Sequence, residues 1–365
     1  MHSGGKEPRA GKLGELALLK QIRARASQCA HGAARGGLRL GIGDDCALLR
    51  MAAGEELAVT TDLSISGRHF RLEWQTPESI GHRTLARGLS DLAAMGARPV
   101  AAFLSLGLPN ELVAVVPEIS SKTRKKIQNQ KKTWLARFLE GFFALASAFQ
   151  TPLAGGDLAE SPIAVADIVL LGAVRRGKAL LRSGARPGDQ LYLTGTLGGA
   201  AAGLARLAQL ADGDRNARSG PPHIPGQLQS VLAPHLYPQP RIAQGLWLAR
   251  RGLASAAIDL SDGLSTDLAH LCEESGVAAE VDAQALPVHL GATLEQALHG
   301  GEDYELLFAA PPAARVPRRI AGVPVTRIGR MLRLRKGRPA VALVNSRDGA
   351  QGKQPLTSQG WEHFF

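Results

Sequence analysis

The chain has 365 residues, of which 45% are hydrophobic and 21% charged, a composition typical of a globular protein long enough for two domains. Its net charge is +11, but one stretch from Lys122 to Lys132, with six basic residues and no acidic one, supplies more than half of the excess, which argues against a nucleic-acid-binding protein. The 3 cysteines are far apart, so we expect neither a disulfide framework nor a zinc site. The longest apolar run, Ile163–Val174, is short and interrupted by Asp167, so we expect a soluble cytoplasmic protein with no signal-peptide core or membrane span.

The first half of the chain alternates predicted helices and strands. Apolar residues at helical spacing predict helices over Leu13–Ala26, Ile80–Met95 and Trp134–Phe149. Strands are predicted over Leu38–Ile42, Glu56–Asp62, Val100–Leu106 and Ile163–Val174, the last of them buried and preceded by a glycine-rich turn at Leu153–Asp157. This half is therefore expected to be rich in strands.

The second half is predicted to follow a junction at Arg175–Pro187. A strand over Leu191–Thr194 enters a glycine-rich turn and a helix, and Asp212–Gly226 has the composition of an exposed loop. A short strand over Ala256–Leu260 ends at Ser261-Asp262-Gly263, and a helix through Leu271 follows. The remainder alternates strands and loops.

Carboxylates are predicted to gather where strands end. The set comprises Asp44, Asp45, Asp62, Asp157, Asp259, Asp262, Glu302 and Asp303, with Asp91 on a helix. A single Asp beside Gly is usually a turn former or a helix cap. Acids from several strand ends, however, repel one another unless cations neutralise them, and carboxylate oxygens are the ligands that Mg²⁺ prefers. The set therefore indicates a phosphate site with several metal ions.

The glycine-rich segments do not match the familiar nucleotide-binding loops. Neither Gly155-Gly156-Asp157 nor Gly195-Thr196-Leu197-Gly198-Gly199 continues to Gly-Lys-Ser/Thr. A protein-kinase glycine loop with its lysine and catalytic loop is also missing from the sequence. If ATP binds, it binds by another architecture.

Seven motifs occur in an order that resembles one enzyme family. They are Gly41-Ile42-Gly43-Asp44-Asp45, Thr60-Thr61-Asp62, Gly67-Arg68-His69-Phe70, Leu89-Ser90-Asp91-Leu92-Ala93-Ala94-Met95-Gly96-Ala97, Gly155-Gly156-Asp157, Ile258-Asp259-Leu260-Ser261-Asp262-Gly263-Leu264 and Gly300-Gly301-Glu302-Asp303-Tyr304-Glu305-Leu306. Together they resemble the thiamine-monophosphate kinase family from Gly14 to Phe364. Seven ordered motifs are far more specific than one glycine loop.

The resemblance implies the α/β fold of the aminoimidazole ribonucleotide synthetase superfamily, with two domains. Residues 1–176 would form an ATP- and Mg-binding domain whose mixed sheet pairs with that of a second chain in a homodimer, with a basic insert at about 119–133. Residues 177–365 would form an α/β domain that contributes to nucleotide and substrate binding. No membrane partner is implied.

The resemblance also implies roles for individual residues. Those that would hold Mg²⁺ are Asp45, Thr60, Thr61, Asp62, Asp91, Asp157, Asp259 and Asp262. Those that would contact ATP are Gly156, Asp157, Arg182 and Ser261, and those that would contact thiamine monophosphate are His69, Glu302 and Trp361. His69 has the alternative of a surface histidine, Arg182 of a solvated junction residue, and Trp361 of a core residue in the C-terminal tail.

The implied reaction is ATP-dependent phosphorylation of thiamine monophosphate to thiamine diphosphate, the final step of thiamine diphosphate synthesis. The acceptor phosphate is already nucleophilic, so several Mg²⁺ ions that screen two polyanions matter more than a general base. We therefore expect direct in-line transfer, with no catalytic base and no phospho-enzyme.

The sequence departs from the family pattern at three places. Gly88 stands where the family generally has Asn, Arg68 occupies the variable position of the Gly-x-His-Phe segment, and the basic segment Ile119–Thr133 lengthens a connection. Two alternatives stay open: another enzyme of the superfamily, such as a ring-closing or selenophosphate synthetase, and a nucleic-acid-binding module that uses Lys122–Lys132. The latter is disfavoured because few aromatic residues accompany those lysines.

Overall fold

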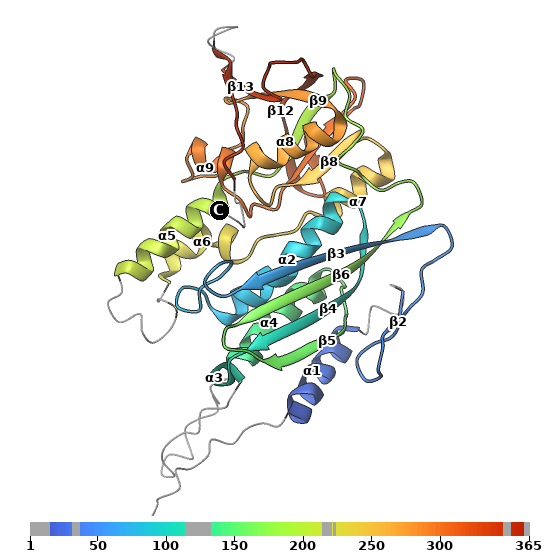
Figure 1. Cartoon of the computed structure of the whole chain (residues 1–365), viewed down its shortest axis with the longest axis vertical. Coiled ribbons are helices and arrows are strands. Elements are labelled where there is room, and N and C mark those ends of the chain that lie inside the picture. Colours follow the sequence, from blue (N-terminus) through green and yellow to red (C-terminus); the bar gives the residue numbers. More distant parts are fainter. Residues whose placement is uncertain are drawn as a thin grey trace, which may run out of the picture.

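The structure is a computed structural model that describes residues 15–30, 37–113, 133–213, 221, 224–345 and 352–360. It confirms the predicted α/β class: a large sheet lies in each half of the chain with helices packed against it, and β1 and β2 form a small additional sheet (Figure 1). The basic segment Lys122–Lys132 and Trp361 lie outside the described residues. Within the described part of the chain, no helix is both long and apolar enough to span a membrane.

The first half is built on a four-stranded sheet in the order β3-β6-β4-β5. Only β4 and β5 pair in parallel. Its elements are α1 (Glu15–Ala30), β1 (Leu38–Leu40), β2 (Leu48–Leu49), β3 (Glu55–Ile65), α2 (Pro77–Ala94), β4 (Arg98–Leu108), α3 (Asn110–Val113), α4 (Trp134–Ala148), β5 (Leu153–Glu160) and β6 (Val165–Arg175).

Helices α2 and α4 cover one face of this sheet because their apolar stripes match its inward residues. Each helix begins at a threonine whose hydroxyl accepts a backbone N–H: Thr76 from Ser79 and Thr133 from Ala136. Phe138 and Phe142 of α4 are fully buried in the same core as strand residues such as Leu170. Burial of this shared apolar surface holds the helices on the sheet.

The second half is built on an eight-stranded sheet in the order β14-β13-β9-β12-β7-β10-β8, with β11 paired to β12. Its elements are β7 (Gln190–Thr194), α5 (Gly199–Gly213), η3 (Gly226–Leu228), α6 (Gln229–Leu236), α7 (Ile242–Arg251), β8 (Ala256–Asp259), α8 (Leu264–Ser275), β9 (Val277–Asp282), α9 (Leu294–His299), β10 (Leu306–Ala310), β11 (Arg319–Ile320), β12 (Val323–Arg333), β13 (Val341–Val344) and β14 (Gln354–Pro355).

Two local predictions are wrong. Leu153–Asp157 is not a turn but the start of β5, which pairs with β4. Gly156 lies there at φ +141°, and an added Cβ would come within 1.9 Å of the Leu104 carbonyl oxygen, so the close approach of β4 explains the glycine. Asp62 does not end its strand, because β3 stays paired with β6 up to Ile65. Helices α6 and α7 were not predicted from sequence.

Candidate active site

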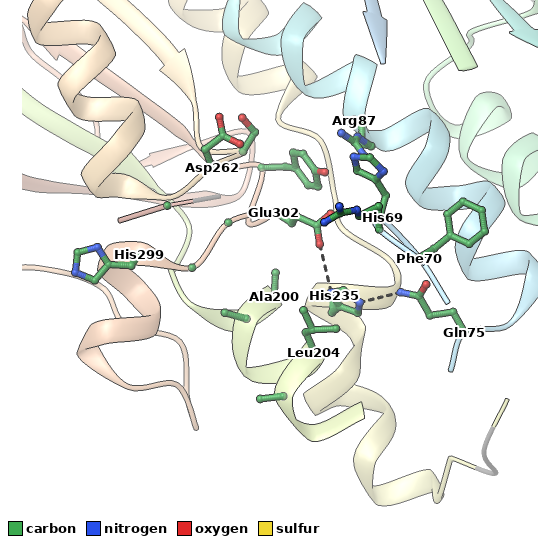
Figure 2. A pocket seen from close by; sticks show the side chains of 18 of the residues that line it. His69, Phe70, Gln75, Arg87, Ala200, Leu204, His235, Asp262, His299 and Glu302 are labelled. Carbon is green, nitrogen blue, oxygen red and sulfur yellow. Dashed lines mark hydrogen bonds and ion pairs between the residues drawn. The ribbon is translucent and has the colours of Figure 1, made fainter. Parts of the chain in front are cut away.

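A cavity of about 890 Å³ lies between the two halves of the chain (Figure 2). Residues from β3 and α2 line it on one side, and the segments after β8 and before β10 line it on the other. The lining includes Asp62, His69, Asp91, Asp259, Ser261, Asp262 and Glu302. Seven residues predicted from sequence as parts of one site therefore share one cavity.

Four carboxylates that line this cavity interact with one another: Asp62 on β3, Asp91 on α2, Asp259 at the end of β8, and Asp262 just after it. Thr60 donates a hydrogen bond to Asp91 Oδ2, and Ser90 Oγ donates to Asp259 Oδ2 over 2.6 Å. The motif Leu89-Ser90-Asp91 thus links the first half of the chain to the second. We call these four residues the acidic cluster.

The acidic cluster is short of positive charge. Burial, with a further contribution from Asp91, raises the pKa of Asp62 to about 6. Burial also raises the pKa of Asp91 and Asp259. Asp62 Oδ2 is buried without a hydrogen-bond partner among the described residues, while Oδ1 lies 3.6 Å from Arg87 Nε. A divalent cation would relieve these energetic costs, so the donor set fits Mg²⁺.

The described side chains do not by themselves enclose such an ion. Among them, no group of three or more His, Cys, Asp or Glu residues has the geometry of a complete metal site. Mg²⁺ in proteins usually keeps several waters and binds one or two carboxylates together with substrate phosphates.

The loop that carries Ser261 and Asp262 is held by a carboxylate that was not singled out from sequence. Asp267 Oδ2, on α8, accepts the backbone N–H of Asp262 at 3.1 Å and of Gly263 at 3.0 Å. Burial and the nearby Asp259 raise the pKa of Asp267 to about 8. Its spacing of five residues after Asp262, at the start of a helix, is the sequence signal that could have indicated this role.

The turn that carries Glu302 has an unusual backbone. Glu302 and Tyr304 have φ values of +66° and +50°, in the left-handed region that side chains other than glycine rarely adopt. Their N–H groups donate to the carbonyl oxygens of Ser261 and Leu260, which holds the turn against the loop that carries Ser261 and Asp262. Gly301 is needed at this contact, because a Cβ would lie 2.5 Å from the Ser261 carbonyl oxygen. Such strain is characteristic of functional sites.

Asp303 closes the glycine-rich turn before α5. Its carboxylate accepts the N–H groups of Gly198 at 2.6 Å and Ala200 at 3.0 Å, which lie at the N-terminus of that helix. A helix N-terminus after glycines can bind phosphate, but here a side chain of the protein itself occupies it. The N-terminus of α5 is therefore capped by Asp303.

His69 and Glu302 line the same cavity. The ring of His69 is held by the N–H of Ile65, which donates to Nδ1 over 3.0 Å. Glu302 accepts from the buried Arg83 and lies 3.6 Å from His235. Arg83, on α2, lowers the pKa of the Glu302 carboxyl against the effect of burial. Apolar residues of α5, including Ala200 and Leu204, form a neighbouring wall (Figure 2).

Other predicted site residues do not reach this cavity. Thr61 points to the opposite face of the sheet from Thr60 and Asp62, because side chains alternate along a strand. Gly156 and Asp157 lie on β5, separated from β3 by two strands, and Asp157 is exposed. Asp45 is exposed in the segment after β1. Arg182 is exposed, but its positive charge offsets part of the rise that burial causes in the pKa of Asp91 and Asp259.

The chain was compared with known proteins. Residues 43–174 match the family model "AIR synthase related protein, N-terminal domain", and residues 186–341 match "AIR synthase related protein, C-terminal domain". Thiamine-monophosphate kinase from Salmonella typhimurium is 39% identical over 338 residues, which cover 89% of this chain and 91% of that protein. The chain belongs to the thiamine-monophosphate kinase family. The Escherichia coli member is 38% identical over 344 residues, covering 90% of this chain and 92% of that protein.

Solved structures of the thiamine-monophosphate kinase family share the fold. The crystal structure from Stenotrophomonas maltophilia has a TM-score of 0.70 at 38% identity and covers 91% of this chain and 96% of that chain. AaThiL complexed with AMPPCP and TMP has a TM-score of 0.67 at 27% identity and covers 99% of this chain and 100% of that chain. The resemblance seen in the sequence motifs is thus confirmed along nearly the whole chain.

Proposed function

We propose that this chain transfers the γ-phosphoryl group of ATP to thiamine monophosphate, giving thiamine diphosphate, the final step in making that cofactor. One observation carries the proposal: a single cavity joins the acidic cluster to Glu302 and His69. The relatives named as thiamine-monophosphate kinases, and the member solved with AMPPCP, an ATP analogue, and TMP, support the same substrates. The substrates fit a cytoplasmic enzyme, and so do Cys46 and Cys272, which are free in the part of the chain that the structure describes.

In this proposal the acidic cluster and the pair Glu302 and His69 have separate tasks. Bound Mg²⁺ ions would screen the phosphates and stabilise negative charge on the transferring group. Asp62, Asp91, Asp259 and Asp262 would hold those ions, with Thr60 and Ser90 orienting two of the carboxylates. Glu302 and His69 would hold the thiamine part of the acceptor. Ser261 and Arg182 would contact ATP.

The acceptor phosphate needs no general base, because a phosphate monoester is largely dianionic at neutral pH. Transfer is then direct and in line, and it depends on positioning and on electrostatic stabilisation. The chain would supply that positioning through groups fixed by buried hydrogen bonds, such as Asp267 under the Ser261–Gly263 loop. We expect no phospho-enzyme.

We also propose that the working enzyme is a homodimer whose sites combine residues of both chains. The sheet face opposite α2 carries exposed Leu57, Val59 and Leu63, with 50%, 56% and 48% of their surfaces accessible. Asp157 and Thr61 have their side chains on this same face. Pairing the face with a second copy would bury the apolar strip and bring acids from one chain toward the cavity of the other. A domain boundary at 176/177, between the sheets, fits this arrangement.

The test is a direct assay. Purified protein is incubated with Mg-ATP and thiamine monophosphate, and ADP and thiamine diphosphate are quantified by chromatography, with free thiamine as a control acceptor. We expect equal amounts of the two products from the monophosphate and none from thiamine. No product from the monophosphate, with Mg-ATP binding retained, would assign the chain another reaction of the superfamily.

A further inference from the structure

A buried polar network lies beside the Glu302 carboxylate and comes from three separate segments, and two of its members, Gln75 and His235, also line the cavity. Arg83 projects from α2, His235 from the last turn of α6, and Gln75 from the loop that also carries His69. Their exposed fractions are 5%, 2% and 3%, so all three are shielded from water. Buried polar side chains are costly unless they are well paired, which makes such a group next to a cavity a candidate for function.

The contacts fix the orientation of each member. The backbone N–H of Arg71 donates to Gln75 Oε1 at 3.2 Å, so the Gln75 amide nitrogen is the atom that faces His235 Nε2, at 2.8 Å. Arg83 Nη1 lies 3.0 Å from the same ring nitrogen. Both neighbours of Nε2 can only donate hydrogen bonds, so Nε2 must be the acceptor.

The ring of His235 is therefore neutral and carries its proton on Nδ1. Burial and the nearby Arg83 guanidinium lower the pKa of His235 to about 3, which agrees with the hydrogen-bond pattern. His235 Nδ1 lies 3.6 Å from Glu302 Oε2 (Figure 2). Arg83 Nη2 donates to Glu302 Oε1 at 2.5 Å. One carboxylate oxygen thus accepts a hydrogen bond from Arg83, and the other faces the His235 Nδ1 nitrogen, which has no hydrogen-bond partner among the described residues.

We propose that Arg83, His235 and Gln75 are positioning residues that keep the Glu302 carboxylate oriented in the cavity for the thiamine part of the acceptor. The inference rests on the proposed function. The acceptor contains a cationic thiazolium ring and an aminopyrimidine, and both are recognised by a fixed anion that accepts hydrogen bonds. Because Gln75 belongs to the segment Phe70–Thr76 that follows His69, the network also ties the loop carrying His69 to Glu302.

Orienting Glu302 and merely packing α2 against α6 are two roles that predict different effects on the Michaelis constants of the two substrates. A network that only holds the helices together would affect every step when it is broken. A network that orients Glu302 affects recognition of the acceptor and leaves the binding of ATP, at the acidic cluster, nearly unchanged. The Michaelis constants for the two substrates therefore separate the two roles.

The experiment is a double-mutant cycle between His235→Ala and Glu302→Gln. We expect His235→Ala to raise KM for thiamine monophosphate about tenfold or more, with kcat and KM for ATP changed less than about threefold. His235→Gln, whose amide oxygen can accept from Arg83 and Gln75, should recover part of the loss. Because His235 acts through Glu302, the double variant should be about as impaired as Glu302→Gln alone.

His82→Gln provides the matched control. His82 is a histidine of similar burial, 7% exposed, whose Nε2 contacts the Pro238 carbonyl oxygen at 2.8 Å and which does not line the cavity. It should keep wild-type constants for both substrates. If His235→Ala does not fold, Gln75→Ala is the milder change, because it removes the hydrogen bond from Gln75 to His235. This variant should also raise KM for the acceptor alone.

Three results would overturn the inference. One is an unchanged KM for the acceptor in a folded His235→Ala variant, another is an equal rise in KM for both substrates, and the third is a double variant whose defects multiply. In each case the proposed function would still hold, provided that the wild-type protein phosphorylates thiamine monophosphate. A wild-type protein that does not turn over this acceptor would refute both.

Discussion

At the scale of single residues, burial shifts the pKa of carboxylates in and next to the cavity away from their values in water. Burial raises the pKa of Asp303 to about 7, and of Asp62 to about 6. Each has a partial compensation: Asp303 accepts two backbone N–H groups, and Asp62 faces Arg87. Glu302 is the exception, because Arg83 lowers its pKa. The cavity lining therefore combines buried carboxylates that a cation would stabilise with one carboxylate, Glu302, that Arg83 already stabilises as an anion.

The raised pKa values predict how the metal-free protein responds to pH. Asp62 has a pKa of about 6 in the folded chain against 3.8 ordinarily, so between these values the folded state binds more protons than the unfolded state. The free energy of unfolding should therefore fall as pH rises from about 4 to above the folded pKa. Urea unfolding in EDTA at several pH values measures this.

Mg²⁺ should reverse the trend, since it binds the ionised carboxylates. We expect Mg²⁺ to stabilise the protein more at pH 8 than at pH 5, and Asp62→Asn to reduce both the pH-dependent loss and the response to Mg²⁺. An equal response to Mg²⁺ at both pH values, or an unchanged response in Asp62→Asn, would contradict the assignment of Asp62 as a metal ligand.

At the scale of helices and strands, glycines set how closely the elements approach. Helices α2 and α4 cross at Gly81 and Gly141, where an added Cβ would lie 2.0 Å from the Phe138 carbonyl oxygen and 1.8 Å from that of Glu78. Helix α7 meets α2 in the same way through Gly245, where an added Cβ would lie 1.9 Å from the Ala93 carbonyl oxygen. Helix α2 carries Arg83 and Asp91, so these contacts also place the site.

Gly141→Ala should therefore destabilise the protein, because the new methyl group meets backbone that cannot move aside. We expect a loss of about 1–3 kcal/mol in the free energy of unfolding, measured with urea. Gly213→Ala, near the end of α5 where an added Cβ meets nothing within 4 Å, is the matched control and should be neutral or stabilising by up to about 1 kcal/mol. Equal effects of the two substitutions would argue against the close crossing.

At the scale of the whole molecule, the acids separate into two groups. Asp62 lies on the helix-covered face of the first sheet, whereas Asp157 lies on β5 with its side chain toward the opposite face. The exposed strip of Leu57, Val59 and Leu63 shares that second face. If both groups act in one reaction, as the family resemblance implies, a second chain is needed to unite them.

Complementation between two variants tests this arrangement. Homodimers of Asp62→Asn and of Asp157→Asn should both be inactive. A heterodimer of the two, co-expressed with different tags and purified by both, contains one site with both aspartates intact and should recover about half of the wild-type activity. Sedimentation velocity checks that each preparation is dimeric. A heterodimer as inactive as its parents would place both aspartates in sites formed within one chain.

Much of the fold and part of the site could be predicted from sequence. The α/β class, the family, and the helices α2 and α4 followed from periodicity and from seven ordered motifs, because amphipathic spacing and motif order are local properties of the chain. Asp62, Asp91, Asp259, Asp262, His69 and Glu302 were predicted together and line one cavity. β5 was mistaken for a turn because its glycines serve strand pairing, which is not visible locally.

Tertiary structure alone decided which residues meet. Asp62 and Thr61 are neighbours in sequence, yet the alternation of β3 sends them to opposite faces. Arg83, His235 and Gln75 carry no shared motif, and only the packing of α6 beside α2 brings them together next to Glu302. The sequence by itself determined the chemical groups and the fold class, whereas the structure decided their pairing, because contacts between distant segments depend on packing and not on local pattern.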